Sequence, residues 1–142
     1  MTQIIKYLLI VLQLTIASGL LNVWLVRFNK KTKYRGANAH NMREEFAAYG
    51  LPVWFMYLVG FLKIVVAVSL ILVLFVPLYV LYIGIPSLLV LSILMLGAIS
   101  MHIKIRDSFI KTLPAILMLV LTLITLLIQV NMNIDRIINI LI

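Results

Sequence analysis

Few residues of this chain could do chemistry, and the position of Lys63 makes it the most informative of them. It lies about ten residues inside an apolar run, 53–75, where a charged side chain costs roughly 2.5–3.5 kcal/mol on insertion scales. Its ammonium group could be the counter-charge of an anionic ligand, a quinone oxygen or a carboxylate. Its long stem could instead reach the membrane boundary and pair with Asn22, Glu44 or Glu45. We favour this second, structural interpretation, because those residues lie at the boundary toward which Lys63 can reach.

Two neighbouring acids, Glu44 and Glu45, resemble the paired carboxylates of acid–base catalysis. Glu44 follows Asn41 by three residues, which is the spacing of a capping box at a helix start. We expect Glu45 to pair with Arg43 or Lys63. Glu44 therefore needs no catalytic role, whereas Glu45 remains a candidate for a ligand pocket.

The histidine at position 102 ends an apolar run and could relay a proton or bind a ligand. At head-group level a histidine more often meets water or a carboxylate. Two aromatic residues lie within a turn or two of Asn22 and Lys63 and could line a ligand cavity. The predicted pocket residues are Asn22, Lys63, His102 and Glu45, with Trp24 and Tyr57 beside them.

Several kinds of chemistry are excluded by composition. The chain contains no cysteine, which rules out disulfides, thiol redox catalysis and thiolate metal sites. Its two histidines are too few for a histidine-only metal site, and we expect no metal. No nucleotide-binding, metalloprotease or serine-hydrolase motif occurs. Any redox role therefore needs a bound cofactor, for which a quinone is the candidate, and the chain is more simply an accessory subunit than an enzyme.

The composition indicates a single membrane domain. Of 142 residues 65% are hydrophobic and the mean hydropathy is +1.21, against roughly 45–50% apolar residues in soluble domains. A helix needs about 20 residues to cross a bilayer, so the length allows four crossings and no extramembrane catalytic domain. The net charge of +8 comes from basic residues beside the apolar runs, where they set topology and meet anionic lipid head groups. We therefore expect a lipid bilayer, and no nucleic acid, as the surroundings.

The apolar runs predict an all-α fold, an antiparallel four-helix membrane bundle. The predicted spans are 4–26, 53–75, 81–101 and 111–129. The run 4–26 also fits a signal peptide, but it is longer than the apolar core of such a peptide and more spans follow. We predict a short interfacial helix over 41–49, ended by Gly50, and a short amphipathic helix over 131–142 lying on the membrane.

Small and polar residues at helical spacing predict which faces of the spans point into the bundle. Each predicted face combines residues three, four or seven positions apart. The faces are Thr15, Ser18, Gly19 and Asn22 in the first span; Gly60, Lys63 and Ala67 in the second; and Met118, Thr122, Thr125 and Gln129 in the fourth.

The basic residues predict the orientation. With four spans, the loops 27–52 and 102–111 lie on the same side and together hold nine basic residues, against only Lys6 and Arg136 on the other. By the positive-inside rule, we expect both loops in the cytoplasm and both termini outside the cell membrane.

Five stretches resemble the DoxX-like family of four-helix bacterial membrane proteins over roughly residues 16–125. They are GLLNVWLVRFN, YRG, MREEFAAYGLPVWFMYLVGFLKI, MLGAISMHIKIRD and LPAILMLVL. The resemblance implies the fold, and it implies relatives that serve as a subunit of a thiosulfate:quinone oxidoreductase or as a membrane partner of a detoxifying oxidoreductase. Distant eukaryotic relatives act in receptor assembly and cargo export. Relatives often have glutamate in the second helix where this chain has Lys63, a reversal of the local charge.

We expect a non-catalytic membrane subunit that binds a quinone or lipid and docks a cytoplasmic oxidoreductase or another membrane protein. The alternative is a membrane-protein assembly factor, which would bind a transmembrane partner and no small ligand. A small transporter comes third, since no span is broken at mid-membrane and no repeat is visible. A second copy of the chain could also be a partner.

Overall fold

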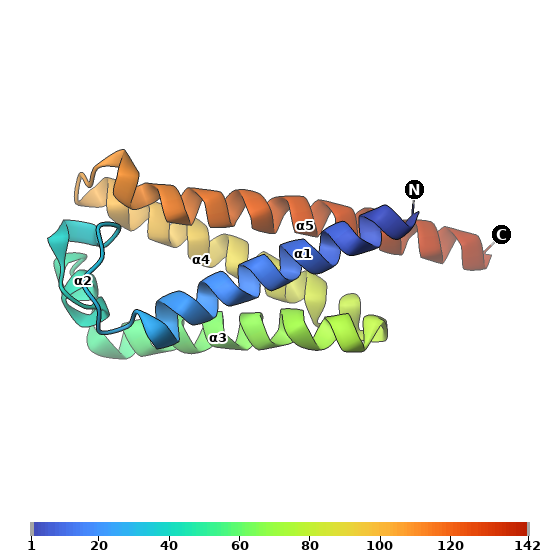
Figure 1. Ribbon diagram of the computed structural model, residues 1–142, viewed down its shortest axis with the longest axis horizontal. Helices are drawn as coiled ribbons and strands as arrows, with labels where there is room; N and C mark the ends of the chain where they lie inside the picture. The colour runs from blue at the N-terminus through green and yellow to red at the C-terminus, as the bar shows by residue number, and fades with distance from the viewer. Residues whose placement is uncertain (1, 142) are drawn as a thin grey trace.

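The computed structural model describes the backbone of residues 2–141 and the side chains of residues 3–134, and every regular element in this part of the chain is helical. Four long helices run antiparallel, and both termini lie at the same end of the bundle (Figure 1). All four are long and apolar enough to cross a membrane. This confirms the predicted all-α, four-helix membrane bundle. The long elements are α1 (Thr2–Leu21), continued by a π-helical turn η1 (Asn22–Val26), then α3 (Val53–Phe75), α4 (Gly84–Lys104) and α5 (Phe109–Leu141).

The boundaries of the last two long helices differ from the predicted ones. The range 77–80 forms a short 3-10 helix, η3 (Pro77–Val80), so α4 begins at Gly84 rather than at residue 81. Helix α5 is continuous as far as Leu141, so residues 131–141 are not a separate helix. Residue 142 lies outside the described residues, and the position of this end relative to the membrane surface stays a prediction.

The core of the bundle is a packed layer of aliphatic side chains from three helices. Its fully or almost fully buried members are Ile16, Ala17 and Leu20 from α1, Val66, Ala67 and Leu70 from α3, and Leu88, Leu91 and Met95 from α4. Large apolar side chains also remain exposed on all four helices. In a bilayer such side chains meet acyl chains, so association of the helices depends on close packing rather than on the removal of water.

The predicted inward faces of α3 and α5 are confirmed. Gly60 and Ala67 are buried and Lys63 is half-buried. On α5, Thr122 and Thr125 are fully buried, and each hydroxyl donates a 2.7 Å hydrogen bond to the carbonyl four residues earlier. These threonines therefore pack without leaving a donor unpaired.

The predicted inward face of α1 is wrong. Thr15, Ser18 and Asn22 are exposed, and the buried face is formed by apolar residues with Gln13 among them. The hydroxyls of Thr15 and Ser18 donate to the carbonyls of Val11 and Leu14 at 2.7 and 2.6 Å. Because each hydroxyl is satisfied within its own helix, it can face lipid at little cost.

Helix α1 crosses the bundle diagonally. It contacts both α3 and α5, and Figure 1 shows that it begins beside α5 and ends beside α3. At the loop end of the bundle, α1 and α5 therefore diverge. The connection between α1 and α3 folds over this end.

That connection contains the predicted interfacial helix, observed as α2 (Met42–Ala48). The side chain of Asn41 accepts a 2.9 Å hydrogen bond from the backbone of Glu44, whose carboxylate accepts one of 2.8 Å from the backbone of His40. The pairing resembles the expected capping box, except that Glu44 accepts from the backbone of the residue before the N-cap and from the Asn41 side chain. The chain then turns at Gly50, which has φ of 76°, a conformation that glycine adopts without strain.

Candidate functional site

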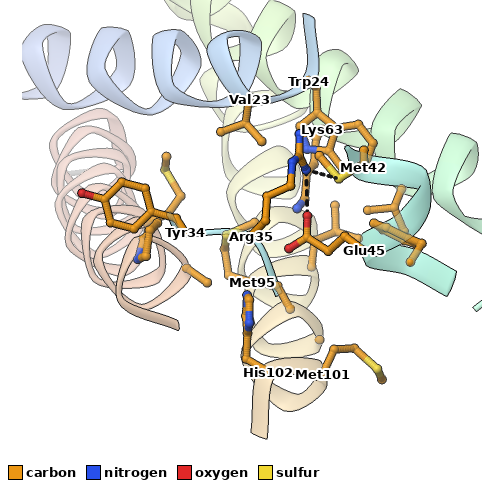
Figure 2. Close-up of a pocket in the computed structure, with 18 of the residues that line it drawn as sticks. Val23, Trp24, Tyr34, Arg35, Met42, Glu45, Lys63, Met95, Met101 and His102 are labelled. Atoms are coloured by element: carbon orange, nitrogen blue, oxygen red, sulfur yellow. Dashed lines mark hydrogen bonds and ion pairs between the residues drawn. The ribbon is translucent and has the colours of Figure 1, made fainter. Parts of the chain in front are cut away.

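A cavity of about 530 Å³ lies at the loop end of the bundle, between the diverging ends of α1 and α5. Residues of α1, α3, α4 and α5 form its walls, and α2 and the preceding loop close it (Figure 2). Most of its surface is apolar, with charged side chains at one end. A cavity of this size and character is typical of small-molecule sites, which span roughly 300–1,000 Å³.

The buried Arg35 and Glu45 form an ion pair at the loop side of the cavity. Nη1 of Arg35 donates to Oε2 of Glu45 at 2.7 Å, and both residues are at most 9% exposed. Figure 2 shows the two side chains directed toward each other. Glu45 also accepts hydrogen bonds from the backbone of Gly36 at 2.8 Å and the hydroxyl of Tyr49 at 3.0 Å. Glu45 therefore pairs with Arg35, and its predicted pairing with Arg43 or Lys63 is wrong.

The same guanidinium ties the end of the first span to this loop. It donates to the backbone carbonyls of Arg27, Phe28 and Lys30, the last two at 3.0 and 2.9 Å. A helix end leaves carbonyls without partners, and a cationic donor placed there is favourable. Arg35 thus connects the end of the first helix to α2.

A chain of polar contacts continues from Tyr49 to the start of α5. The Tyr49 hydroxyl lies 3.5 Å from Nε2 of His102, and Nδ1 of His102 lies 2.8 Å from Oδ2 of Asp107. Asp107 also accepts hydrogen bonds from Lys111 at 3.2 Å and from the backbone of Ala37 at 3.1 Å. Three separate segments are therefore held together by one carboxylate.

These surroundings shift the pKa of two groups. Burial and the neighbouring Glu45 carboxylate raise the pKa of Tyr49, so its hydroxyl stays protonated and acts as a donor. Burial alone would raise the pKa of Asp107, but hydrogen bonds from His102, Ala37 and Lys111 outweigh it and lower that pKa below 3.8. Asp107 is therefore ionised whenever the network is intact.

The lowered pKa of Asp107 predicts a loss of stability in acid. A carboxyl group with a depressed folded-state pKa contributes stability that is complete above its unfolded pKa and is lost as the pH falls through the folded value. Thermal unfolding in detergent should thus show a falling midpoint below about pH 4. The Asp107→Asn variant should be less stable at neutral pH, and the difference from wild type should shrink in acid. A difference that stays constant with pH would contradict this assignment.

Lys63 points into the cavity without a carboxylate partner. Its Nζ lies 5.2 Å from the centroid of the Trp24 ring, close enough for a cation–π contact. None of the three ion pairs and none of the side-chain hydrogen bonds among residues 3–134 includes Lys63. The predicted structural pairing with Asn22, Glu44 or Glu45 is therefore not what the structure shows.

Four of the six predicted pocket residues line the cavity together: Lys63, Glu45, His102 and Trp24. Asn22 and Tyr57 are exposed and are not among the lining residues. Tyr57 instead accepts a 3.2 Å hydrogen bond from Arg43 and stacks on Phe28 outside the cavity.

Four polar residues of the site were not among the predicted pocket residues: Arg35, Tyr49, Asp107 and Lys111. One signal could have pointed to Asp107. The chain has only four acids against twelve lysines and arginines, so each acid next to an apolar run has a strong tendency to be paired.

The assembled groups can bind and orient a ligand. Within the described residues, no three histidine or acidic side chains gather as a metal site. The cavity offers a free ammonium group, an aromatic face and an apolar interior. This set suits a molecule with a polar head and an apolar body.

Comparison with protein families supports the resemblance seen in the sequence. Residues 32–125, more than half of the chain, match the DoxX-like family. No curated protein and no solved structure matches the chain. The matched range includes the loop from residue 32 onward, α2, α3, α4 and most of the spanning part of α5, and so holds most of the residues that line the cavity. The chain is a multi-pass membrane protein and belongs to the DoxX-like family.

Proposed function

We propose that this protein is a non-catalytic membrane subunit that binds a quinone or a lipid in the cavity beside Lys63 and docks an oxidoreductase or another partner. The observation that carries the proposal is the ammonium group of Lys63, which faces the cavity and forms no ion pair with any side chain of residues 3–134. A ligand oxygen at that position would supply the missing partner.

Energetics favour a binding role for Lys63. A lysine within a span costs several kcal/mol unless it is paired or hydrated. The Trp24 face offsets part of that cost, since a cation–π contact is worth about 0.5–2 kcal/mol. The remaining free-energy cost of the buried charge is reduced when a ligand accepts hydrogen bonds from the ammonium group, which has three N–H donors.

The docking part of the proposal rests on the loop 27–52 and on what the family resemblance implies. Lys30, Lys31 and Lys33 are exposed on this loop and suit an acidic partner or anionic lipid head groups. By the positive-inside rule the loop faces the cytoplasm.

Because the chain has no cysteine, a Lys31→Cys variant in intact cells should react with an impermeant maleimide only after the membrane is opened. Labelling without opening would overturn the orientation.

Native mass spectrometry of protein purified from its own membranes tests ligand binding. Wild type should retain a small molecule that Lys63→Met loses, because methionine keeps the unbranched apolar stem of the side chain but not its donors. Lys63→Arg, which keeps a cation, is the matched control and should retain more of the ligand. The same adducts on wild type and Lys63→Met, with both proteins folded, would refute the role of Lys63.

A further inference from the structure

We infer that the ligand of this cavity is a long-chain carboxylate, an amphiphile with one negative charge on a single acyl chain. The inference rests on the proposed function, in which Lys63 receives the ligand head group. The charges around the cavity favour an anionic ligand over a neutral one, and the shape of the cavity favours a single chain.

The charge balance leaves one positive charge without a partner. Arg35 is paired with Glu45, and Asp107 is shared by His102 and Lys111. These contacts use Glu45 and Asp107, while Glu44 is exposed and caps α2 outside the cavity. Among the described residues Lys63 has no ion pair of its own: it lies over the Trp24 ring, and the Glu45 carboxylate attracts it only from beyond ion-pair distance.

One further cation, Arg27, also lines the cavity, but Arg27 is exposed. Its guanidinium can be hydrated at the loop surface, so it needs no charge from a ligand. Lys63 lies deeper, within α3, where hydration is poorer. A single negative charge at Lys63 therefore balances the deep part of the cavity.

A neutral ligand would not achieve this balance. A quinone oxygen or an alcohol can accept a hydrogen bond from the ammonium, but the complex would still hold an uncompensated charge in apolar surroundings, which is costly. A carboxylate accepts the hydrogen bond and removes the net charge.

The shape of the cavity suits one chain. Its apolar wall includes small residues on two facing helices, Gly97 and Ala98 of α4 and Ala115 of α5. A Cβ atom built on Gly97 would meet no atom within 4 Å, so there is open space beside the α4 backbone. Ile93 and Gly97 line the cavity and are also exposed, which gives an acyl chain a route to the lipid around the bundle.

Equilibrium binding of three radiolabelled probes to delipidated protein in a neutral sugar detergent tests this inference. The probes are palmitate, hexadecanol with the same chain and no charge, and decylubiquinone. We expect wild type to prefer palmitate over hexadecanol by about tenfold or more, which is the scale of one charged hydrogen bond. Lys63→Met should abolish that preference, whereas Lys63→Arg should keep most of it.

Gly97→Leu provides a second variant that leaves every charge in place. Its side chain should fill open space and weaken palmitate and hexadecanol alike, without removing the preference for palmitate. Equal weakening supports the position of the acyl chain. Unchanged binding of both probes would overturn it.

The outcomes separate this inference from the proposed function. Equal affinity of wild type for palmitate and hexadecanol would overturn the inference, and that comparison requires no variant to fold. If decylubiquinone alone binds in a manner that depends on Lys63, the inference fails and the proposed function stands. If no probe depends on Lys63, both fail.

Discussion

Replacement of Arg35 by methionine should lower the free energy of unfolding by about 3–5 kcal/mol, because it strands a buried carboxylate. Glu45 would keep its hydrogen bonds from Gly36 and Tyr49 but lose its only ion pair within the described residues. The carbonyls of Arg27 and Phe28 would lose a donor at the same time. Both the ion pair and the hydrogen bonds to the carbonyls at the end of the first span depend on this one side chain.

Reversible unfolding in mixed detergent micelles would measure this loss. Lys33→Met is the matched control, since Lys33 is an exposed cation on the same loop and surface substitutions usually change stability by less than about 0.5 kcal/mol. The double variant Arg35→Met with Glu45→Gln should recover part of the loss, because it removes the unpaired charge. An Arg35→Met protein as stable as the control would show that the pair does not hold the loop.

The fold was predictable from the sequence because the bilayer sets the length of each span and demands that backbone groups be paired within it. Helix α2 was predictable because its cap is local. Asn41 and Glu44 are three residues apart, and the Asn41 side chain accepts a hydrogen bond from the Glu44 backbone and donates one to the Glu44 carboxylate. The inward face of α1 was not, because spacing identifies polar side chains that share a face but does not say where their hydrogen bonds go. Thr15 and Ser18 bond within their own helix, and the rule for polar residues between helices does not apply to them.

The site was only partly predictable. Lys63 and His102 lie where the spans bring them: His102 in the last turn of α4, and Lys63 about ten residues inside α3. The partners of the network are joined by the loop instead: Asp107 reaches Ala37, which has φ of 51°, and no periodic pattern encodes such a turn. Asn22 begins a π-helical turn that ends with a 2.8 Å hydrogen bond from Arg27. The extra residue in that turn changes the direction of the side chains that follow, and Trp24 is buried while Asn22 faces outward.

The second large effect should come from Gly60→Ala. A Cβ atom at this position would lie 2.6 Å from Cε3 and Cζ3 of Trp24, far inside van der Waals contact. The Trp24 ring is rigid, 6% exposed and packed edge-on against Phe46 at 6.1 Å between ring centroids. The added methyl group must therefore displace the ring into the cavity that it lines, or push α3 away from the end of the first span. Overpacking of this kind costs about 1–3 kcal/mol.

Gly97→Ala is the matched substitution at an open position. Its Cβ atom would meet nothing within 4 Å, and alanine gains about 1 kcal/mol over glycine in a helix. The two variants should therefore change the free energy of unfolding in opposite directions. Gly19→Ala should fall between them, because its Cβ atom would lie 2.7 Å from only the terminal methyl of Met118, and a methionine side chain adapts readily.

Trp24 itself can report the cause of these effects. The chain has two tryptophans, and Trp54 is 67% exposed, so a Trp54→Phe background leaves Trp24 as the single fluorophore. In that background Gly60→Ala should shift the emission, whereas Gly97→Ala should not. The displaced ring would also move away from the Lys63 ammonium, so Gly60→Ala should weaken ligand binding although it changes no polar group. Destabilisation by Gly60→Ala with an unchanged Trp24 emission would mean that the close approach of Gly60 and Trp24 is not the constraint that positions Lys63.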